Sequence, residues 1–411
     1  MPEVKMAQAW QELGFTDCLR KRVSHPKRLT IPRDDYQKTG MYPVIDQSAD
    51  FVSGWTDLAE AAISDHLPII VFGDHTRVFK YVDFPFVMGA DGTKLLYVNN
   101  DILDPYFFYF AMLHLHIPNK GYNRHYKYLS ETTVRFPSSK EEQRAIAHVL
   151  RTVQQAREAR QREIELERER KAALMQHLFT HGMLGEPRKQ TEIGEMPESW
   201  QVVKLERACR LIQYGTSEYC SVDAVGLPVL RIPNVVNGVI DVHDLKFIEL
   251  PKDTADRLTL HIGDLLFVRT NGRREYTGRC AVYEGEPEQS LFASYLIRAR
   301  LDTDILLPRF LQRYTMTTRG QSYLSGRASN AADGKFNINT QTIKGVLTPL
   351  PPLAEQQEIT NVLDACDAKS AALAREWALL DEAFRTLLEE LMTGRLLSLP
   401  LIVPVVETAL V

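Results

Sequence analysis

The chain has 411 residues, of which 44% are hydrophobic and 25% charged, and its formal net charge is −4. Such a composition is typical of an ordinary soluble protein with two or three domains. The acidic balance gives no support to general nucleic-acid affinity, although a local basic face remains compatible with it. The cysteines are scattered, with no CxxC pair, which favours a reduced, cytoplasmic compartment and argues against structural zinc.

The first globular segment is expected over residues 1–137. Its beginning lacks the apolar run of a signal peptide. Short apolar runs such as Leu67–Phe72 alternate with turn signals such as Gly73-Asp74 and Asp91-Gly92. The pattern predicts a mixed α/β (α+β) domain.

A long helix is predicted next, over residues 138–181. It opens with the cap-like Ser138-Ser139 and with acidic residues, and it stops at His181-Gly182. Several glycines and prolines follow in residues 182–199, which are therefore predicted to be a linker.

The second half repeats this plan. A second globular segment is predicted over residues 200–349, and a second long helix over residues 350–395, ending at Gly394. The tail, residues 396–411, is apolar but short and broken by prolines, so we expect it to pack on the protein and not to cross a membrane.

The two helices are copies of one another. Glu142–Leu150 returns as Glu355–Leu363 at an offset of 213 residues, and the offset holds without a gap as far as Thr180 and Thr393. A spacing this long excludes a solenoid, whose units usually recur every 20–50 residues or so. The chain is therefore predicted to hold two copies of a large module, each followed by a helix, with pseudo-two-fold symmetry.

The helices are predicted to pair with each other as an antiparallel coiled coil. In the second helix, apolar residues recur at alternating spacings of four and three. The first helix has nine basic against seven acidic residues over 138–185, and the second has four against nine over 350–395, so their charges are opposite. The centre of the first helix is charged, and we expect other subunits or water to meet it there. The residues predicted for helix pairing and subunit docking are Ile146, Leu150, Leu174, Leu178, Ile359, Leu363, Leu373, Trp377, Leu380, Phe384, Leu387 and Leu391.

No catalytic or metal-binding motif is present in the sequence. It contains no GxxxxGK[ST], HExxH, GxSxG or strand-associated GxGxxG motif. The string Asp83-Phe84-Pro85-Phe86 departs at its second position from the tetrad by which adenine methyltransferases hold a flipped base. We therefore predict no catalytic residue, no metal ligand and no cofactor bound by this chain.

Basic, polar and turn-rich segments are the candidate binding residues. Arg and Asn can read base edges with two hydrogen bonds, while Arg, Thr and backbone amides suit phosphates. Any one such segment is more often a solvated loop, but both modules carry several. The predicted DNA-binding residues are His75, Thr76, Arg77, Lys120, Tyr122, Asn123, Arg124, Tyr214, Thr216, Ser217, Arg269, Asn271, Arg273, Arg274, Arg327 and Asn330.

This organisation resembles the specificity subunit of a type I restriction–modification enzyme. Each helix opens with Glu-Gln-x-x-Ile, at Glu142–Ile146 and Glu355–Ile359. Ile193–Trp200 is similar to the lead-in to that family's second target-recognition domain, and Leu391–Leu396 to the end of its second helix. Tyr42–Gln47 and Phe72–Thr76 also resemble strings in such domains, but the first module has only Trp10 and Leu13 to match the lead-in.

The resemblance implies a non-catalytic, DNA-recognising subunit. Each module would read one half of a split, asymmetric double-stranded DNA target. The helices would fix the gap and dock two methyltransferase subunits, which bind S-adenosylmethionine, and restriction subunits that use ATP and Mg would join them. Two alternatives stay open: a coiled-coil scaffold that binds only proteins, and a methyltransferase or nuclease with diverged motifs.

Overall fold

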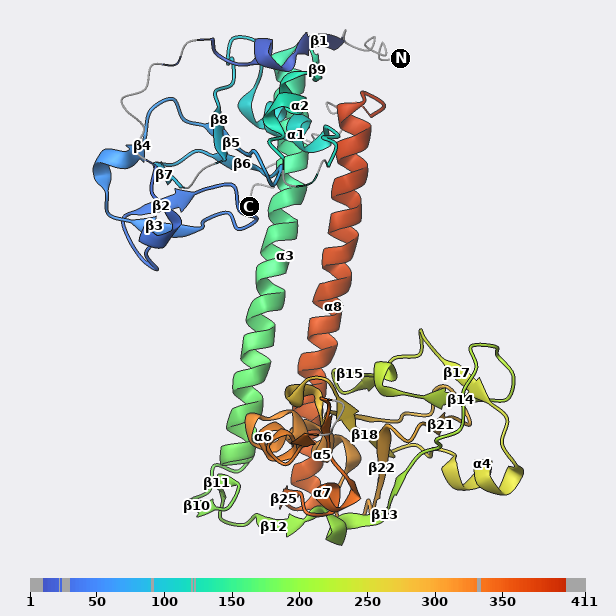
Figure 1. The fold of residues 1–411 in the computed structure, drawn as a ribbon. Helices are drawn as coiled ribbons and strands as arrows, with labels where there is room; N and C mark the ends of the chain where they lie inside the picture. Colours follow the sequence, from blue (N-terminus) through green and yellow to red (C-terminus); the bar gives the residue numbers. More distant parts are fainter. Residues whose placement is uncertain are drawn as a thin grey trace, which may run out of the picture. The chain divides into compact units, whose positions relative to one another are not determined.

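The computed structural model divides the chain into two compact units. The first unit comprises Met1–Arg162 and Ala374–Val411, and the second comprises Glu163–Leu373. Two long helices, α3 (Lys140–His181) and α8 (Leu353–Met392), each contribute one part to each unit (Figure 1). The structure describes residues 10–21, 23, 30–89, 92–119, 121, 123–330 and 334–396.

The first unit is built on two small sheets, with strand orders β3-β2-β7-β4 and β6-β5-β8, and on the pair β1-β9. Its strands are β1 (Trp10–Gly14), β2 (Tyr42–Ile45), β3 (Gly54–Thr56), β4 (Ala62–Ile63), β5 (Ile69–Gly73), β6 (Phe79–Val82), β7 (Phe86–Met88), β8 (Thr93–Leu96) and β9 (Thr133–Pro137). Its short helices are α1 (Pro105–His114) and α2 (Tyr126–Ser130). Aromatic residues of α1 fill the core, and Phe384 and Leu391 of α8 join the same cluster.

The second unit holds sheets of strand order β13-β22-β18-β20, β17-β14-β21 and β19-β24-β23, and the pairs β10-β11, β12-β25 and β15-β16. Its strands are β10 (Arg188–Thr191), β11 (Gly194–Pro197), β12 (Gln201–Lys204), β13 (Cys209–Tyr214), β14 (Leu227–Leu230), β15 (Val235–Val236), β16 (Val239–Ile240), β17 (Lys246–Ile248), β18 (Leu265–Val268), β19 (Thr270–Asn271), β20 (Cys280–Val282), β21 (Leu291–Phe292), β22 (Leu296–Leu301), β23 (Ser329–Asn330), β24 (Phe336–Asn337) and β25 (Leu347–Leu350). Its short helices are α4 (Lys252–Leu258), α5 (Pro308–Met316), α6 (Thr318–Gly326) and α7 (Thr340–Lys344).

The two units share a strand topology. In the first, β2 pairs in parallel with β7 and antiparallel with β3; in the second, β14 pairs in parallel with β21 and antiparallel with β17. Likewise β5 lies between β6 and β8, and β18 lies between β20 and β22. The duplication extends to the start of each module, because Trp10 opens β1 and Trp200 directly precedes β12. Trp10 is therefore the counterpart of Trp200.

A buried glutamine attaches the start of each long helix to its module. The side-chain oxygen of Gln143 accepts from the Asp104 amide at 2.8 Å, and its nitrogen donates to the carbonyls of Pro137 and Ile102. The side chain of Gln356 accepts from the Leu307 amide at 2.8 Å and donates to the carbonyls of Pro351 and Ile305. Each glutamine thereby satisfies three backbone groups, one of them fully buried, which explains the glutamine at each helix start.

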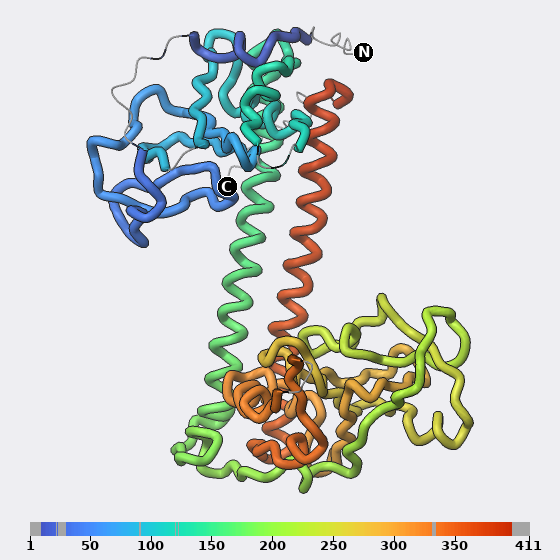
Figure 2. Tube along the Cα trace, in the orientation of Figure 1, coloured from blue at the N-terminus to red at the C-terminus, as the bar shows by residue number. Residues whose placement is uncertain are grey.

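Within each unit the two long helices run antiparallel, since residue numbers rise along one as they fall along the other. In the first unit Arg157 reaches Asp381 at 2.9 Å and Arg160 reaches Glu376 at 3.0 Å. In the second, Lys369 reaches Glu167 at 2.6 Å and Lys171 pairs with Asp367. The charged centre of α3 thus pairs with oppositely charged residues of α8 in each unit, and that other subunits meet it there stays a prediction. Figure 2 shows the end of α8 returning to the N-terminal segments.

The end of each long helix lies against a tryptophan of the module. Gly182 follows α3 with φ +65°, and a Cβ placed there would lie 3.4 Å from the Trp200 ring. Gly394 follows α8 with φ +71°, and its Cβ would lie 3.0 Å from the Trp10 indole nitrogen. Only glycine combines this backbone conformation with so close an approach.

The segment predicted as a linker has a structure of its own. Residues 188–197 form the hairpin β10-β11, in which Lys189 pairs with Met196. Met196 and the following Trp200 are buried in the core of the second unit. Burial of these apolar side chains orders the segment despite its glycines and prolines.

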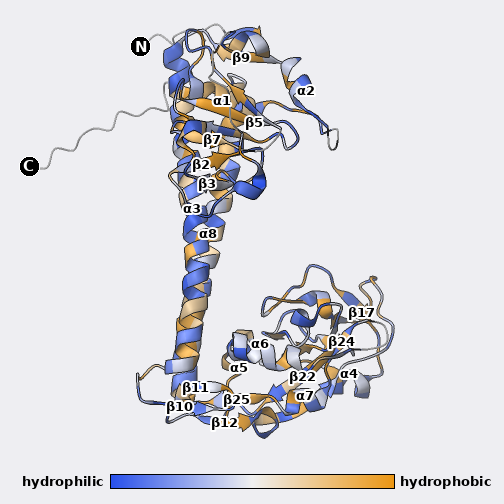
Figure 3. Ribbon diagram, turned by 60° about the vertical axis from the view of Figure 1, so that its left-hand side comes forward, coloured by the Kyte–Doolittle hydropathy of each residue, from blue (hydrophilic) through white to orange (hydrophobic). Residues whose placement is uncertain are grey.

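Hydropathy follows the same plan in both units. Apolar residues gather in the strands, and hydrophilic residues alternate with them along α3 and α8 (Figure 3). In the described part of the chain, no helix combines the length and hydropathy that a membrane crossing requires.

Candidate nucleic-acid interface

The largest set of predicted binding residues lies at the end of β18 in the second unit. Arg269 follows this strand, and its guanidinium lies 4.8 Å from the ring centre of Tyr214 and donates to the Ser294 carbonyl at 3.2 Å. Tyr214 ends β13, which lies in the same sheet as β18. Sheet order therefore brings together two segments that are far apart in the sequence.

The small sheet β19-β24-β23 adds the third segment. Asn271 pairs with Phe336, and Asn330 pairs with the same Phe336 from the other side. Arg274 donates to the Ala328 carbonyl at 3.1 Å. The three polar segments that the sequence singled out in this module thus form one cluster around β19.

The arginines of this cluster have no carboxylate partner in the part of the chain that the structure describes. Arg269, Arg273, Arg274 and Arg327 form no ion pair with any residue that the structure describes, although Glu218 and Glu275 occur in the same segments. Instead their guanidinium groups lie near aromatic rings, such as Arg327 at 3.6 Å from Tyr323. Stacking holds one face of a guanidinium while its edge stays available for phosphate or base atoms. Such a set can bind anions.

Two predicted residues shape the turn after β13. Thr216 is only 8% exposed, and its hydroxyl accepts from the Glu218 amide at 3.1 Å, so it supports the turn. Ser217 is exposed beside it. Two further tyrosines are exposed: Tyr219, in the same polar segment as Tyr214 and Ser217, to 85%, and Tyr295, which sequence reasoning missed, to 57%. Exposed aromatic rings suit stacking with nucleic-acid bases, but no local pattern in the sequence marks Tyr295.

In the first unit the predicted residues gather at the end of β5, the counterpart of β18. His75, Thr76 and Arg77 follow this strand. The buried Asp74 accepts from the backbone amides of His125 and Tyr126, so the loop with Asn123 and Arg124 lies beside them. Lys120 and Tyr122 lie outside the described residues.

The basic residues of this first cluster differ in how many of their N–H groups are free to bind a ligand. Arg77 adopts φ +64° and donates to the Ile117 carbonyl at 3.0 Å, so part of its guanidinium is already used. Arg124 is exposed and has no ion pair among the described residues. Lys94 of β8, missed by sequence reasoning, lies opposite Phe72 and 5.8 Å from the Tyr126 ring.

A buried ion pair between Lys80 and Asp46 stabilises a loop that contacts the first cluster. The Lys80 ammonium donates to the Asp46 carbonyl at 2.8 Å and lies 4.0 Å from the Asp46 carboxylate. Burial opposes ionisation of Asp46, but hydrogen bonds from Ser48 and Ser53 and the charge of Lys80 outweigh it and lower its pKa. Burial lowers the pKa of Lys80 against the attraction of Asp46. The pair fixes the loop whose Gln47 carbonyl accepts from the Thr76 hydroxyl.

The helix residues predicted for pairing and docking lie mostly inside the modules. Ile146, Leu150, Phe384 and Leu391 belong to the core of the first unit, with Leu387 packed against it. Leu178, Ile359 and Leu363 belong to the core of the second unit, with Leu174 packed against it. Leu373 is buried, and Trp377 and Leu380 are half-buried. Among the described residues, no three His, Cys, Asp or Glu side chains are placed to hold a metal ion.

Taken together, the fold has two modules of shared strand topology, each of which presents loops at the end of an equivalent strand. The model of the type I restriction modification DNA specificity domain matches residues 24–168. The chain is 31% identical over 209 residues to a protein named as the MjaX type I restriction enzyme specificity subunit of Methanocaldococcus jannaschii. It is 28% identical over 194 residues to the EcoKI specificity subunit of Escherichia coli K12.

These alignments cover 50% and 44% of this chain, and 48% and 41% of the two relatives, so the chain matches about half of their length or less. Its fold is similar over 95% of the chain to the S subunit of a type I system from M. genitalium, which it covers to 97%, with a TM-score of 0.59 at 16% identity. In sequence and in fold, the predicted resemblance to type I specificity subunits is confirmed.

Proposed function

We propose that this chain is the non-catalytic DNA-recognition subunit of a type I restriction–modification complex, and that each unit reads one half of a split, asymmetric target. The observation that carries the proposal is the placement of the two polar clusters. Both follow the equivalent strands β5 and β18, and both present arginines that form no ion pair with a described carboxylate. Arg and Asn side chains on such loops suit base edges and phosphates.

In this proposal α3 and α8 fix the gap between the two half-targets. They also dock two methyltransferase subunits, and restriction subunits complete the complex. S-adenosylmethionine belongs to the methyltransferase subunits, and ATP with Mg to the restriction subunits. The continuity of both helices, each of which contributes to both units, supports this role, because a helix grows in length by about 1.5 Å for each residue.

The decisive experiment maps methylated adenines across host DNA by single-molecule sequencing, with this chain present and deleted. The proposal expects a two-part motif with a fixed gap that is lost on deletion. Methylation that is unchanged by the deletion would contradict it. Methyl transfer by the purified chain alone, with labelled S-adenosylmethionine and DNA, would instead indicate a diverged methyltransferase. DNA binding that ignores half-target spacing would indicate a protein-only scaffold.

The double variant Arg273→Ala and Arg274→Ala tests the cluster of the second unit. A lost base contact costs about 1–3 kcal/mol and relaxes specificity at one position, whereas a lost phosphate contact weakens binding to all sequences. Loss of a phosphate contact should therefore lower methylation of the site by the assembled enzyme, and loss of a base contact should allow methylation of related sequences. Normal methylation would remove these residues from the interface; Arg188→Ala, on the β10-β11 hairpin, serves as a control.

A further inference from the structure

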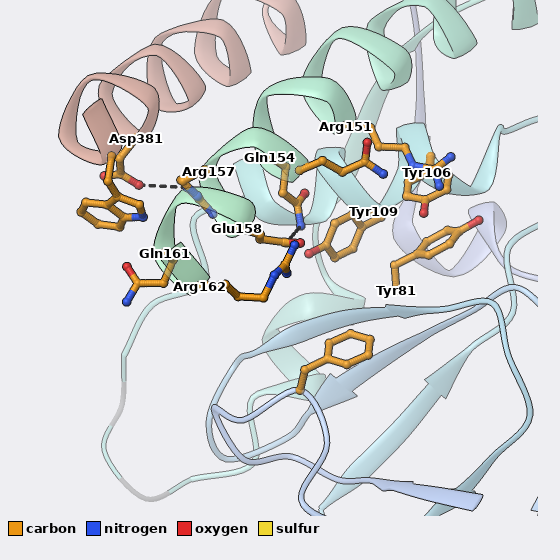
Figure 4. A pocket seen from close by; sticks show the side chains of 13 residues that line it. Tyr81, Tyr106, Tyr109, Arg151, Gln154, Arg157, Glu158, Gln161, Arg162 and Asp381 are labelled. Carbon is orange, nitrogen blue, oxygen red and sulfur yellow. Dashed lines mark hydrogen bonds and ion pairs between the residues drawn. The ribbon is translucent and has the colours of Figure 1, made fainter. Parts of the chain in front are cut away.

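A cavity of about 760 Å³ lies within the first unit, between α1, β6 and the long helices (Figure 4). Its aromatic lining includes Tyr81 and Tyr106, whose rings stack with centres 3.7 Å apart, and Tyr109. Burial raises the pKa of all three phenols, which therefore stay neutral. Cavities of 300–1,000 Å³ with aromatic walls and a few polar groups are typical of small-molecule sites.

The cavity also holds arginines that differ in their pairing. Arg157 is bound to Asp381 at 2.9 Å and serves the helix pair. Arg151 lies 4.5 Å from the Tyr106 ring centre, and neither it nor Arg162 forms an ion pair among the described residues. The other carboxylate in the lining, Glu158, accepts from the Gln154 amide at 2.8 Å. Two positive charges thus face the cavity against one negative charge.

The second unit provides an internal comparison. A cavity of about 900 Å³ lies at the equivalent place, and Asp364 and Asp367 replace Arg151 and Gln154 of the repeat. Arg309 stands where the first unit has Tyr106. These charges neutralise one another, because Arg313 reaches both carboxylates at 2.6 Å. Stacked tyrosines, and arginines without an ion pair among the described residues, are therefore particular to the first cavity and are not required by the fold.

We propose that the cavity of the first unit binds a nucleotide unit, with its base on the Tyr81 ring of the stacked pair and its phosphate on Arg151 and Arg162. Bases stack on aromatic rings in a sequence-tolerant way, and a guanidinium binds phosphate with two parallel hydrogen bonds. The nucleotide is either free or part of a DNA strand. This inference goes beyond the proposed function, which gives this chain no small-molecule ligand, and does not depend on it.

The test is calorimetric titration of the purified full-length chain with dAMP, deoxyadenosine and inorganic phosphate. We expect dAMP to bind at one site per chain and deoxyadenosine and phosphate to bind at least tenfold more weakly. The double variant Arg151→Gln and Arg162→Gln should lower the affinity for dAMP at least tenfold. Arg375→Gln removes an exposed charge at the position of α8 equivalent to Arg162, outside the cavity lining, and should change the affinity less than twofold.

Absence of dAMP binding, or equal affinity in the Arg151→Gln and Arg162→Gln variant, would overturn the proposal. Addition of duplex DNA distinguishes the two sources: displacement of dAMP indicates a nucleotide of DNA, and unchanged binding indicates a free nucleotide. Because Arg273→Ala and Arg274→Ala lie in the other unit, they should leave dAMP binding intact. Failure of this inference is thereby separate from failure of the proposed DNA recognition.

Discussion

Glu142 and Glu355 are equivalent residues with different surroundings. The carboxylate of Glu355 accepts from the Trp200 indole N–H at 2.9 Å and from the Met183 amide at 2.8 Å. Glu142 is equally buried, but its Oε2 atom has no hydrogen-bond partner among the described residues. Burial raises the pKa of Glu142 above its ordinary value of 4.5. A carboxylate without partners in such a place destabilises the folded chain when it is charged.

The stability of the first unit should therefore depend on whether the Glu142 carboxyl is protonated. A carboxyl whose pKa is raised on folding contributes stability below its unfolded pKa, and the contribution is lost as pH rises through the folded pKa. Glu142→Gln removes the charge, so this variant should melt above the wild type at pH 7. The difference should shrink as the pH falls toward 4.5. Thermal melting at several pH values checks this, and Glu355→Gln, which disturbs two hydrogen bonds, should lower the melting temperature at pH 7.

Replacement of Gln356 tests the attachment of α8 to its module. Gln356→Leu removes the side-chain partner of the Leu307 amide and of the Ile305 carbonyl, which are partly buried, and of the Pro351 carbonyl, which is buried. An unsatisfied buried group costs about 1–3 kcal/mol, so we expect the free energy of unfolding to fall by about 2–3 kcal/mol in urea titrations. The neighbouring Gln357 is exposed and bonds only the Asn361 side chain among the described residues, so Gln357→Leu should cost less than about 0.5 kcal/mol. Equal losses in the two variants would contradict this role.

At the scale of elements, the end of α3 depends on a glycine for two reasons. A side chain at Gly182 meets the Glu355 carboxylate at 2.7 Å and Pro197 at 2.9 Å, in addition to the strain of its positive φ. Gly185 shares the conformation, φ +62°, but has open space around it. Gly185→Ala should therefore cost about 1 kcal/mol, and Gly182→Ala about 2 kcal/mol more, in thermal or urea unfolding. Equal costs would show that the contact with Glu355 and Pro197 is unimportant.

Signals within a few neighbouring residues predicted the long helices well. These signals are the Glu-Gln starts, the alternating apolar spacing, and the glycines at the ends, Gly182 and Gly394. Helix α3 ends directly before Gly182, and α8 ends one residue, Thr393, before Gly394. The partners of Arg157 and Lys171 could not be predicted, since they depend on the register between two helices far apart in the sequence. The sequence offered Trp10 as a match to the lead-in before the second module but without its neighbouring residues, and the pairing of β1 with β9 and of β12 with β25 makes Trp10 the counterpart of Trp200.

In the candidate interface, too, the local sequence predicted the segments but not how they come together. Residue type alone selected the arginine segments, because turn-rich basic strings are recognisable locally. Their assembly around β19 required the order of strands in two sheets, which the sequence does not state. Tyr295 was missed for this reason: it follows Ser294 at a strand start, and only contact between its carbonyl and the Arg269 amide places it in the cluster.

At the scale of the whole molecule, the length of the helices is the variable to change. Seven residues inserted into both α3 and α8 add about 10 Å, which corresponds to roughly three base pairs of DNA. Under the proposed function, the preferred gap of the methylated motif should lengthen by about that amount, as read by single-molecule sequencing. The same insertion into the β10-β11 turn, between Glu192 and Ile193, should leave the gap unchanged. A gap that ignores the helix insertions would contradict the spacer role.

The end of α8 completes the first unit, and this has a consequence for folding during synthesis. The second unit is one continuous stretch, Glu163–Leu373, whereas the first unit is completed only by residues that follow it. Phe110 and Leu150 of the first core pack in one cluster with Phe384 and Leu391 of α8. Because the chain leaves the ribosome N-terminus first, Phe110 and Leu150 stay exposed to solvent until nearly the whole sequence, including α8, has emerged. The unit translated first is therefore the last that can finish folding, and during that interval its open core is a target for chaperones and proteases.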